Sequence, residues 1–484
     1  SELSYGELDH RVRSFAAGIL ATGIRPEERI LLIMHDTVDM PVAFLGALFA
    51  GVVPVAINTL LPAQDYAYMI EHSGAKAVIV SAPLLSCLED ALEIAGVKPD
   101  VIVSGTDNLE AGLRPFSGLL DAAPLAHAEY AKTNADDFAF WLYSSGSTGR
   151  PKGTVHSHAN LYWTAELYGK PILGLRTEDI VFSAAKLFFA YGLGNGLTFP
   201  LSVGATVVLM AERPTPQAVF NRLTQHRPTV FYGVPTLYVA MLASPDLPPK
   251  SAVALRVCTS AGEALPREAG EKFKKQFGCD ILDGIGSTEM LHIFISNREG
   301  EVRYGTTGKP VPGYEVELRG EDQQRVPVGE IGDLYIRGPS AALLYWSNRE
   351  KTRSTFLGDW VKSGDKYVAD ADGYYTYAGR SDDMLKVSGQ YVSPIEVESA
   401  LIAHDAVLEC AVIGKPDDKG LTKTMAYVVL KSTNGSAALE TELKEFVKSR
   451  LAPHKYPREI LFVNELPKTA TGKIQRFKLR ALQG

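Results

Sequence analysis

Short, almost wholly apolar runs that alternate with helical patterns constrain the fold of this chain more than any other feature of its sequence. Seven such runs are typical of strands: 29–34, 52–57, 77–80, 206–210, 229–232, 255–259 and 280–282. Between them apolar residues recur at helical spacing, as at 8–20 behind the capping box of Ser4 and Glu7. Strands that are apolar on both faces belong to parallel sheets with helices on either side. The sequence therefore predicts an α/β fold.

The pattern changes in the second half of the chain. From 308 to 377 glycine and proline become frequent and strand-like runs alternate in polarity, which favours a small antiparallel sheet or barrel. A short, charged α+β segment follows Arg380. Because 484 residues exceed what one hydrophobic core usually spans, we expect two or more domains.

Charge and composition argue against several functional classes. The net charge is −7, so nothing favours nucleic acid or an anionic membrane as a partner. The uncharged stretches 40–64 and 187–211 are long enough to cross a bilayer, but glycines and prolines interrupt both, and we expect no membrane insertion. The 4 cysteines form no CxxC pair, which indicates buried thiols in a reducing compartment. We therefore expect a cytoplasmic protein with small-molecule partners.

The strongest chemical signal is the polar run YSSGSTGRPKG at 143–153. Glycines let a backbone approach a phosphate closely, N–H groups and hydroxyls donate to it, and Lys152 adds positive charge. The apolar run before it would deliver this loop to a sheet edge, where α/β folds bind ligands. The spacing is not that of a Walker A loop, and the same composition is also typical of a flexible loop. The candidate phosphate-binding residues are Ser144, Ser145, Gly146, Ser147, Thr148, Gly149 and Lys152.

This run resembles the phosphate loop of the adenylate-forming superfamily, which comprises acyl-CoA synthetases, peptide-synthetase adenylation domains and firefly-type luciferases. Further segments resemble the superfamily's other motifs in the same order: GIGSTE at 284–289, SGD at 363–365, GRSDDMLKVSG at 379–389 and PKTATGK at 467–473. Each key residue alone has an ordinary explanation, such as a turn for Asp365 or a solvated surface for Lys473. Their joint occurrence covers essentially the whole chain, which is identified as a member of the superfamily.

The resemblance implies a domain arrangement and a reaction. A large domain, residues 1–381, would hold two parallel α/β sheet subdomains and a small β-barrel-like subdomain. A small mobile α+β domain, residues 382–484, would rotate about Asp382 and bring the face of Gly389 to the site for the second step. A carboxylate would first attack the α-phosphorus of ATP, with pyrophosphate leaving, and coenzyme A would then take the acyl group from the adenylate. The implied cofactors are ATP, Mg²⁺ and coenzyme A.

The resemblance also implies roles for individual residues. Lys473 would stabilise the charge shared by the carboxylate and the α-phosphate, and Glu289 would hold Mg²⁺. Asp365 and Arg380 would bind the ribose and its surroundings. The implied catalytic residues are Lys473, Lys152, Thr148 and Glu289.

The adenine side carries one departure from the superfamily pattern. An aromatic residue often stacks on adenine where this chain has Ile285, whose apolar face can still pack against the base. The segment 262–264 matches the other adenine-side segment. The remaining nucleotide-binding candidates are Gly262, Glu263, Ala264, Asp283, Gly284, Ile285, Gly286, Ser287 and Thr288.

The acyl pocket decides which acid is bound. Peptide-synthetase domains place an aspartate near Phe189 to pair an ammonium group, and none stands here. Acetate-type enzymes narrow the pocket with a tryptophan near Gly286, so glycine implies room. The residues expected to line the pocket suit a flat, apolar ring. The chain as a whole looks like the benzoate–CoA ligases, which form benzoyl-CoA through benzoyl-adenylate. The expected lining residues are Phe189, Ala190, Tyr191, Ala261, Gly286, Leu291, His292 and Ile293.

Two alternatives stay open at this point. A medium- or short-chain acyl-CoA ligase would share every motif and differ only in the acid, and a competition between benzoate and hexanoate separates the two. A pseudo-enzyme that only binds nucleotide belongs to a different class, and intact Lys152, Glu289 and Lys473 argue against it. The sequence does not fix the tolerated ring substituents or the oligomeric state, for which a homodimer is one option.

Overall fold

The computed structural model describes residues 2–122, 130–144, 150–381, 383–387, 390–416, 421–431, 435–452, 454–468 and 474–482. The chain forms two compact units: Ser1–Glu315 with Ile336–Lys362, and Val316–Tyr335 with Ser363–Gly484. The predicted boundary residue Asp382 lies outside the described residues.

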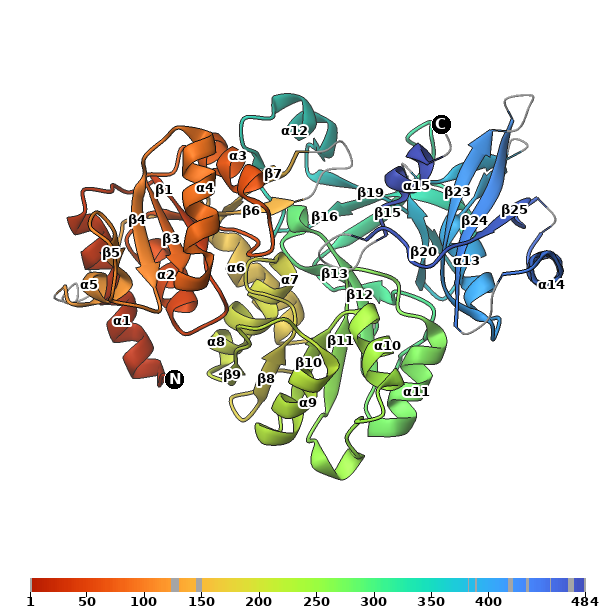
Figure 1. Ribbon diagram of the computed structural model, residues 1–484, viewed down its shortest axis with the longest axis horizontal. Helices are drawn as coiled ribbons and strands as arrows, with labels where there is room; N and C mark the ends of the chain where they lie inside the picture. Colours follow the sequence, from red (N-terminus) through yellow and green to blue (C-terminus); the bar gives the residue numbers. More distant parts are fainter. Residues whose placement is uncertain are drawn as a thin grey trace. The chain divides into compact units, whose positions relative to one another are not determined.

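An 8-stranded sheet opens the first unit, and Figure 1 labels its strands β1 and β3 to β7. The strand order is β17-β7-β6-β2-β1-β3-β4-β5. The strands from β6 to β5 in this order are parallel, and β7 runs antiparallel to both β6 and β17. Their bounds are β1 (Arg29–Ile33), β2 (Val53–Ala56), β3 (Ala77–Ser81), β4 (Asp100–Ser104), β5 (Arg114–Pro115), β6 (Phe138–Ser144), β7 (Lys152–Ser157) and β17 (Leu344–Tyr345).

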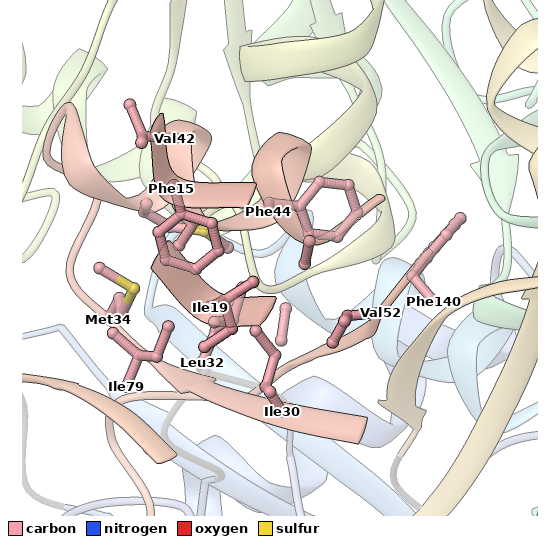
Figure 2. Close-up of a cluster of buried hydrophobic side chains, with 14 of the residues drawn as sticks. Phe15, Ile19, Ile30, Leu32, Met34, Val42, Phe44, Val52, Ile79 and Phe140 are labelled. Atoms are coloured by element: carbon pink, nitrogen blue, oxygen red, sulfur yellow. The ribbon is translucent and has the colours of Figure 1, made fainter. Parts of the chain in front are cut away.

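Helices cover this sheet on both faces, as alternate residues of β1 show. Ile30 and Leu32 belong to the same buried cluster as Phe15 of α1 (Tyr5–Ala21) and Phe44 of α2 (Asp39–Phe49), which Figure 2 shows. Leu31 and its neighbours on the opposite face pack with α3 (Ala63–Ser73) and α4 (Leu85–Ala95). The continuous apolar runs therefore arise because both sides of each strand are buried.

A 7-stranded sheet follows, with the order β14-β13-β12-β11-β10-β8-β9 (Figure 1). Strands β9, β8, β10, β11 and β12 are parallel, and β13 and β14 extend the sheet antiparallel. Helices α9 (Pro216–Gln225), α10 (Pro235–Ala243) and α11 (Arg267–Phe277) pack against its core. The strand bounds are β8 (Ile180–Ser183), β9 (Thr206–Val208), β10 (Val230–Gly233), β11 (Val257–Ser260), β12 (Ile281–Gly286), β13 (Ile293–Ser296) and β14 (Lys309–Pro310).

The two long uncharged stretches are short elements of these sheets. Residues 40–64 contain most of α2 and all of β2, as the sequence predicts. Residues 187–211 contain α7 (Ala190–Leu193), a π-helix η3 (Gly194–Thr198), α8 (Phe199–Val203) and β9. Within the described ranges, no helix combines the length and apolar character needed to cross a membrane.

The second unit carries the antiparallel and α+β structure predicted after 308. Strand β19 (Trp360–Ala369) pairs antiparallel with β20 (Tyr375–Arg380). Strands β23 (Val407–Pro416), β24 (Thr422–Leu430) and β25 (Glu459–Phe462) form a 3-stranded sheet. Residues of α13 (Pro394–Ile402) and α14 (Ala437–Lys448) share a core with β23 and β24. The α/β class with parallel sheets and a separate small C-terminal domain is therefore confirmed.

Candidate active site

The predicted phosphate loop joins two antiparallel strands. Ser144 ends β6, Lys152 begins β7, and the two residues are partners in the strand register. The hairpin therefore brings both ends of the loop together at the edge where β6 stops. The loop residues Ser145, Gly146, Ser147, Thr148 and Gly149 lie outside the described residues.

Glu289 lies beside this hairpin, on the short helix η5 (Thr288–Met290) that follows β12. Its Oε1 is 3.6 Å from Nζ of Lys152 and accepts hydrogen bonds from Ser144 Oγ at 3.3 Å and the Tyr345 hydroxyl at 2.7 Å. Nζ of Lys152 also donates to the Tyr345 oxygen at 3.2 Å. Ser287 caps the turn, because its Oγ accepts from the backbone N–H of Met290 at 3.2 Å. Strands β6, β7, β12 and β17 thus meet at one cluster of four polar side chains.

These contacts keep the partly buried carboxyl of Glu289 ionised. Burial raises the pKa of Glu289, but the Lys152 charge and the hydroxyls of Tyr345 and Ser144 outweigh it, so the pKa is lowered overall. Among the described residues, no three His, Cys, Asp or Glu side chains are grouped to hold a metal. Mg²⁺ takes one or two protein carboxylates and completes its shell with water and substrate phosphates. One ionised, partly buried carboxylate beside a phosphate loop fits that requirement.

His156 of β7 joins neighbouring elements behind this cluster. The ring of His156 stacks on Phe140 at 5.0 Å, and its Nδ1 lies 2.9 Å from Nδ2 of Asn160. Nδ2 of Asn160 also donates to the carbonyl of Ala341 at 3.2 Å. Ala341 lies three residues before β17 begins. Burial lowers the pKa of His156 to about 4, so its imidazole is neutral at pH 7. Sequence analysis did not single out His156, Asn160 or Tyr345.

The predicted adenine-side segments follow two neighbouring parallel strands. Ser260, at the end of β11, is the register partner of Asp283 on β12. Gly262 has φ +95°, which glycine adopts without strain, and Glu263 accepts from the Thr236 hydroxyl at 2.8 Å. Ala264 is exposed and Ile285 half-buried. The segments therefore share the carboxyl edge of the sheet, where ligands bind in open α/β folds.

At this edge of the sheet the pKa of Asp283 is shifted strongly from its ordinary value. Asp283 is buried, and its Oδ1 has no hydrogen-bond partner among the described residues. Burial raises its pKa to about 8, and the polar groups of Ser260 and of the Leu265 backbone offset only part of this rise. The group is therefore largely a neutral acid at pH 7.

His292, predicted to bind the acid, packs against the predicted residue Tyr191 and against two further aromatic side chains, Phe199 and Tyr168. Its ring centroid lies 5.6 Å from Tyr191, 4.5 Å from Phe199 and 5.3 Å from Tyr168. Its Nε2 is 3.3 Å from the carbonyl oxygen of Tyr191. Burial lowers the pKa of His292 to about 3, so this wall carries a neutral ring.

The absence of a side chain at Gly286 lets the backbone of β12 approach the backbone of His292 and Ile293 closely. A Cβ atom on Gly286 would lie 2.5 Å from the carbonyl oxygen of His292 and 2.9 Å from the N atom of Ile293. Leu291, which lies between η5 and β13, has a left-handed backbone with φ +64°. Phe189 precedes α7 and contacts Phe188 with ring centroids 4.6 Å apart. Ala190, Ala261, Leu291 and Ile293 are buried.

The predicted ribose-binding residues pair within the second unit. Asp365 and Arg380 are register partners on β19 and β20, and Nη1 of Arg380 lies 3.0 Å from Oδ1 of Asp365. The Asp365 side chain is 12% exposed, whereas the Arg380 side chain is 44% exposed. Lys473, Gly389 and Asp382 lie outside the described residues, so their roles stay predictions.

Comparison with known proteins places the chain in a family. The model of the AMP-binding enzyme family matches residues 1–346, and that of the AMP-binding enzyme C-terminal domain matches residues 396–473. The chain belongs to the AMP-binding enzyme family, and the predicted superfamily is confirmed.

Two relatives with high identity to the chain are ligases of aromatic acids. The chain is 58% identical over 484 residues to a benzoate–CoA ligase of Thauera aromatica, covering 99% of this chain and 90% of the relative. It is 47% identical to a 4-hydroxybenzoate–CoA/benzoate–CoA ligase of Rhodopseudomonas palustris, covering 99% and 89%. The crystal structure of a benzoate CoA ligase from Burkholderia xenovorans LB400 matches at TM-score 0.91 and 65% identity, covering 99% of this chain and 94% of that one.

Proposed function

We propose that this protein is an ATP-dependent acid–CoA ligase that converts benzoate into benzoyl-CoA through a benzoyl-adenylate, releasing AMP and pyrophosphate. The observation that carries the proposal is the wall of flat side chains around His292, in a chain 58% identical to a benzoate–CoA ligase. A neutral imidazole beside Tyr191 offers an aromatic face without a buried charge. A benzene ring gains by burying its faces against such side chains.

The first half-reaction joins two anions, so neutralisation and positioning dominate its barrier. Lys152 supplies positive charge at one end of the phosphate loop, and Ser144 supplies a hydroxyl at the other. Tyr345 holds Lys152 and Glu289 in place through its hydroxyl. Ser147 and Thr148 are the loop hydroxyls that we propose for the phosphates.

Mg²⁺ belongs to the proposal through Glu289. When bound, the ion would neutralise charge on the phosphate oxygens and assist the departure of pyrophosphate. The contribution of the chain is a carboxylate that stays ionised although it is largely removed from solvent, because Lys152 and Tyr345 lower its pKa. No other residue of the described part is proposed as a metal ligand.

Residues further along the chain would supply the remaining groups. We propose that Asp365 and Arg380 bind the ribose, and that Lys473 stabilises charge between the carboxylate and the α-phosphate. Rotation about Asp382 would then bring the Gly389 face to the site for attack by the coenzyme A sulfur. The segment matched by the C-terminal family domain, residues 396–473, includes Lys473. A homodimer and a cytoplasmic location stay predictions.

The test is acid-dependent AMP release. The protein is incubated with ATP, Mg²⁺, coenzyme A and either benzoate, a hydroxybenzoate, hexanoate or acetate. Benzoate should give the highest kcat/KM, with little AMP from hexanoate or acetate. AMP release led by hexanoate would keep the ligase and reject the aromatic pocket, and none with any acid would reject the ligase.

A further inference from the structure

Asp36 is a buried acidic residue outside the predicted site. Its carboxyl group binds the backbone of Leu187, in the loop that leads to the predicted acid-binding residues. Asp36 follows β1 in the first sheet and is 5% exposed. Both of its carboxylate oxygens lie 3.2 Å from the backbone N atom of Leu187, and they share its N–H as acceptors. Leu187 belongs to the segment between β8 and α7, which is in the second sheet's part of the chain. This contact thus joins two residues 151 positions apart.

The segment after Leu187 is tightly folded. The N–H of Phe189 donates to the carbonyl of Lys186 at 3.0 Å, and the N–H of Leu193 donates to the carbonyl of Phe189 at 2.8 Å. A Cβ on Gly192 would lie only 2.0 Å from the Lys186 carbonyl oxygen, so the backbone turns back on itself there. A displacement at Leu187 is therefore transmitted to Phe189 and the residues that follow it.

The far end of the same segment is anchored separately. The hydroxyl of Tyr191 hydrogen-bonds to Thr259 of β11 and donates to the carbonyl of Gly233 of β10 at 3.3 Å. The predicted acid-binding residues Phe189, Ala190 and Tyr191 thus lie between two fixed points. One is the second sheet, and the other is Asp36.

Lys186 provides the charge that accompanies this carboxylate. Its Nζ donates to the carbonyl oxygens of Met210 and, at 2.7 Å, Glu212, so it too is fixed by backbone. Burial raises the pKa of Asp36 to about 7, and the Lys186 charge and the Leu187 N–H oppose this rise. Since a protonated carboxyl or an amide also presents a carbonyl oxygen, the Leu187 N–H needs an acceptor here rather than a charge.

We propose that Asp36 is a positioning residue for the aromatic acid: it fixes Leu187 and thereby places Phe189, Ala190 and Tyr191 against the ring. This inference rests on the proposed function. Asp36 touches neither substrate nor nucleotide in the proposal, and its effect falls on the affinity for the acid.

The experiment compares three substitutions at this position in the full-length chain. Asp36→Ala removes the acceptor, and Asp36→Ser replaces it with a hydroxyl on a shorter side chain. Both should raise the KM for benzoate about tenfold, while kcat at saturating benzoate and the KM for ATP stay within about twofold. Asp36→Asn keeps an acceptor oxygen of the same reach and should restore a KM near that of the wild type.

Asp39→Ala is the matched control. Asp39 lies three positions further on, in the first turn of α2, and accepts from the Ser104 hydroxyl of β4 at 2.6 Å. Its loss should leave the KM for benzoate unchanged.

An unchanged benzoate KM in Asp36→Ser overturns the proposal. So does a parallel loss of kcat and of both KM values together with a lower unfolding midpoint, since that pattern indicates only damage to the fold. Asp36→Asn behaving like Asp36→Ala also overturns it, because the charge would then matter. Failure of the proposed function differs from all of these outcomes: the wild-type protein itself would form no benzoyl-adenylate.

Discussion

Nζ of Lys152 lies 3.6 Å from Oε1 of Glu289, and only 15% of each side chain is exposed. The Tyr345 hydroxyl bonds to both groups, at 3.2 Å and 2.7 Å. Taking a carboxylate out of water is costly, and the Lys152 charge is the largest of the contacts that lower the pKa of Glu289. The arrangement keeps a cation for phosphate and an anion for a metal ion next to each other.

Replacing Glu289 with glutamine should abolish most adenylate formation. The amide keeps the size of the side chain but leaves Lys152 without its negative partner and Mg²⁺ without an anionic ligand. We expect kcat for benzoyl-adenylate formation to fall about 10²- to 10³-fold, with a higher Mg²⁺ requirement. Pyrophosphate release at varied Mg²⁺ measures both. Glu301→Gln, in an exposed pair with Lys309, is the control, and equal activity of the two variants would contradict the metal role.

Replacing Tyr345 with phenylalanine should weaken the first half-reaction without changing acid binding. The ring remains, but the hydroxyl that joins Lys152 to Glu289 is lost. A lost hydrogen bond to a charged group predicts a decrease of about tenfold in kcat/KM for ATP and an unchanged KM for benzoate. Steady-state kinetics with either substrate varied give both values. Tyr5→Phe removes an unrelated hydroxyl, bonded to the Ala205 carbonyl, and should have no effect.

The strands could be predicted because burial on both faces leaves a continuous apolar run. The runs at 29–34, 229–232 and 280–282 correspond to β1, β10 and β12. Strand β8 (Ile180–Ser183) was missed although it is as long as β10, so length alone does not explain the difference. The π-helix η3 has no local signal either, since its hydrogen-bond spacing is imposed by packing.

The site was only partly accessible to sequence reasoning. Motifs locate Ser144, Lys152 and Glu289, because phosphate chemistry restricts residue types within short segments. Tyr345 belongs to no such segment, since a two-residue strand paired with β7 carries it to the cluster. Asp36 is likewise joined to Leu187 only through the packing of two sheets. Contacts of this kind depend on the fold and leave no spacing to detect.

Lys473→Ala should separate the two half-reactions. In the proposed mechanism its charge acts only while the carboxylate attacks the α-phosphorus. The variant should lose at least about 10²-fold in benzoyl-adenylate formation, yet convert supplied benzoyl-adenylate and coenzyme A to benzoyl-CoA at nearly the wild-type rate. Single-turnover assays of each half-reaction test this. Equal losses in both would reject the assignment. Lys98→Ala, a lysine of the first unit with no proposed role, controls for the loss of one positive charge.

Gly286→Ala should damage the acid-binding wall. The added Cβ would lie 2.5 Å from the His292 carbonyl oxygen and 2.9 Å from the N atom of Ile293, and backbone atoms on a strand cannot move independently. We expect kcat/KM for benzoate to fall at least about tenfold, as overpacking displaces the His292 ring. Gly6→Ala, where a Cβ meets nothing within 4 Å, should leave activity intact. Full activity of Gly286→Ala would show that the wall yields without loss.

Asp283→Asn should change the pH dependence of stability. The unfolded carboxyl ionises near pH 3.8, whereas burial raises the native pKa to about 8. Between these values the native state binds one more proton than the unfolded chain, so this group lowers stability as pH rises through the window. Asparagine cannot ionise, and its benefit relative to the wild type should grow by up to about 4 kcal/mol between pH 5 and pH 8. Urea unfolding at both pH values measures this difference, with the exposed Asp246→Asn as the control for losing one charge. The same difference between variant and wild type at both pH values would mean that Asp283 is ionised in the folded protein.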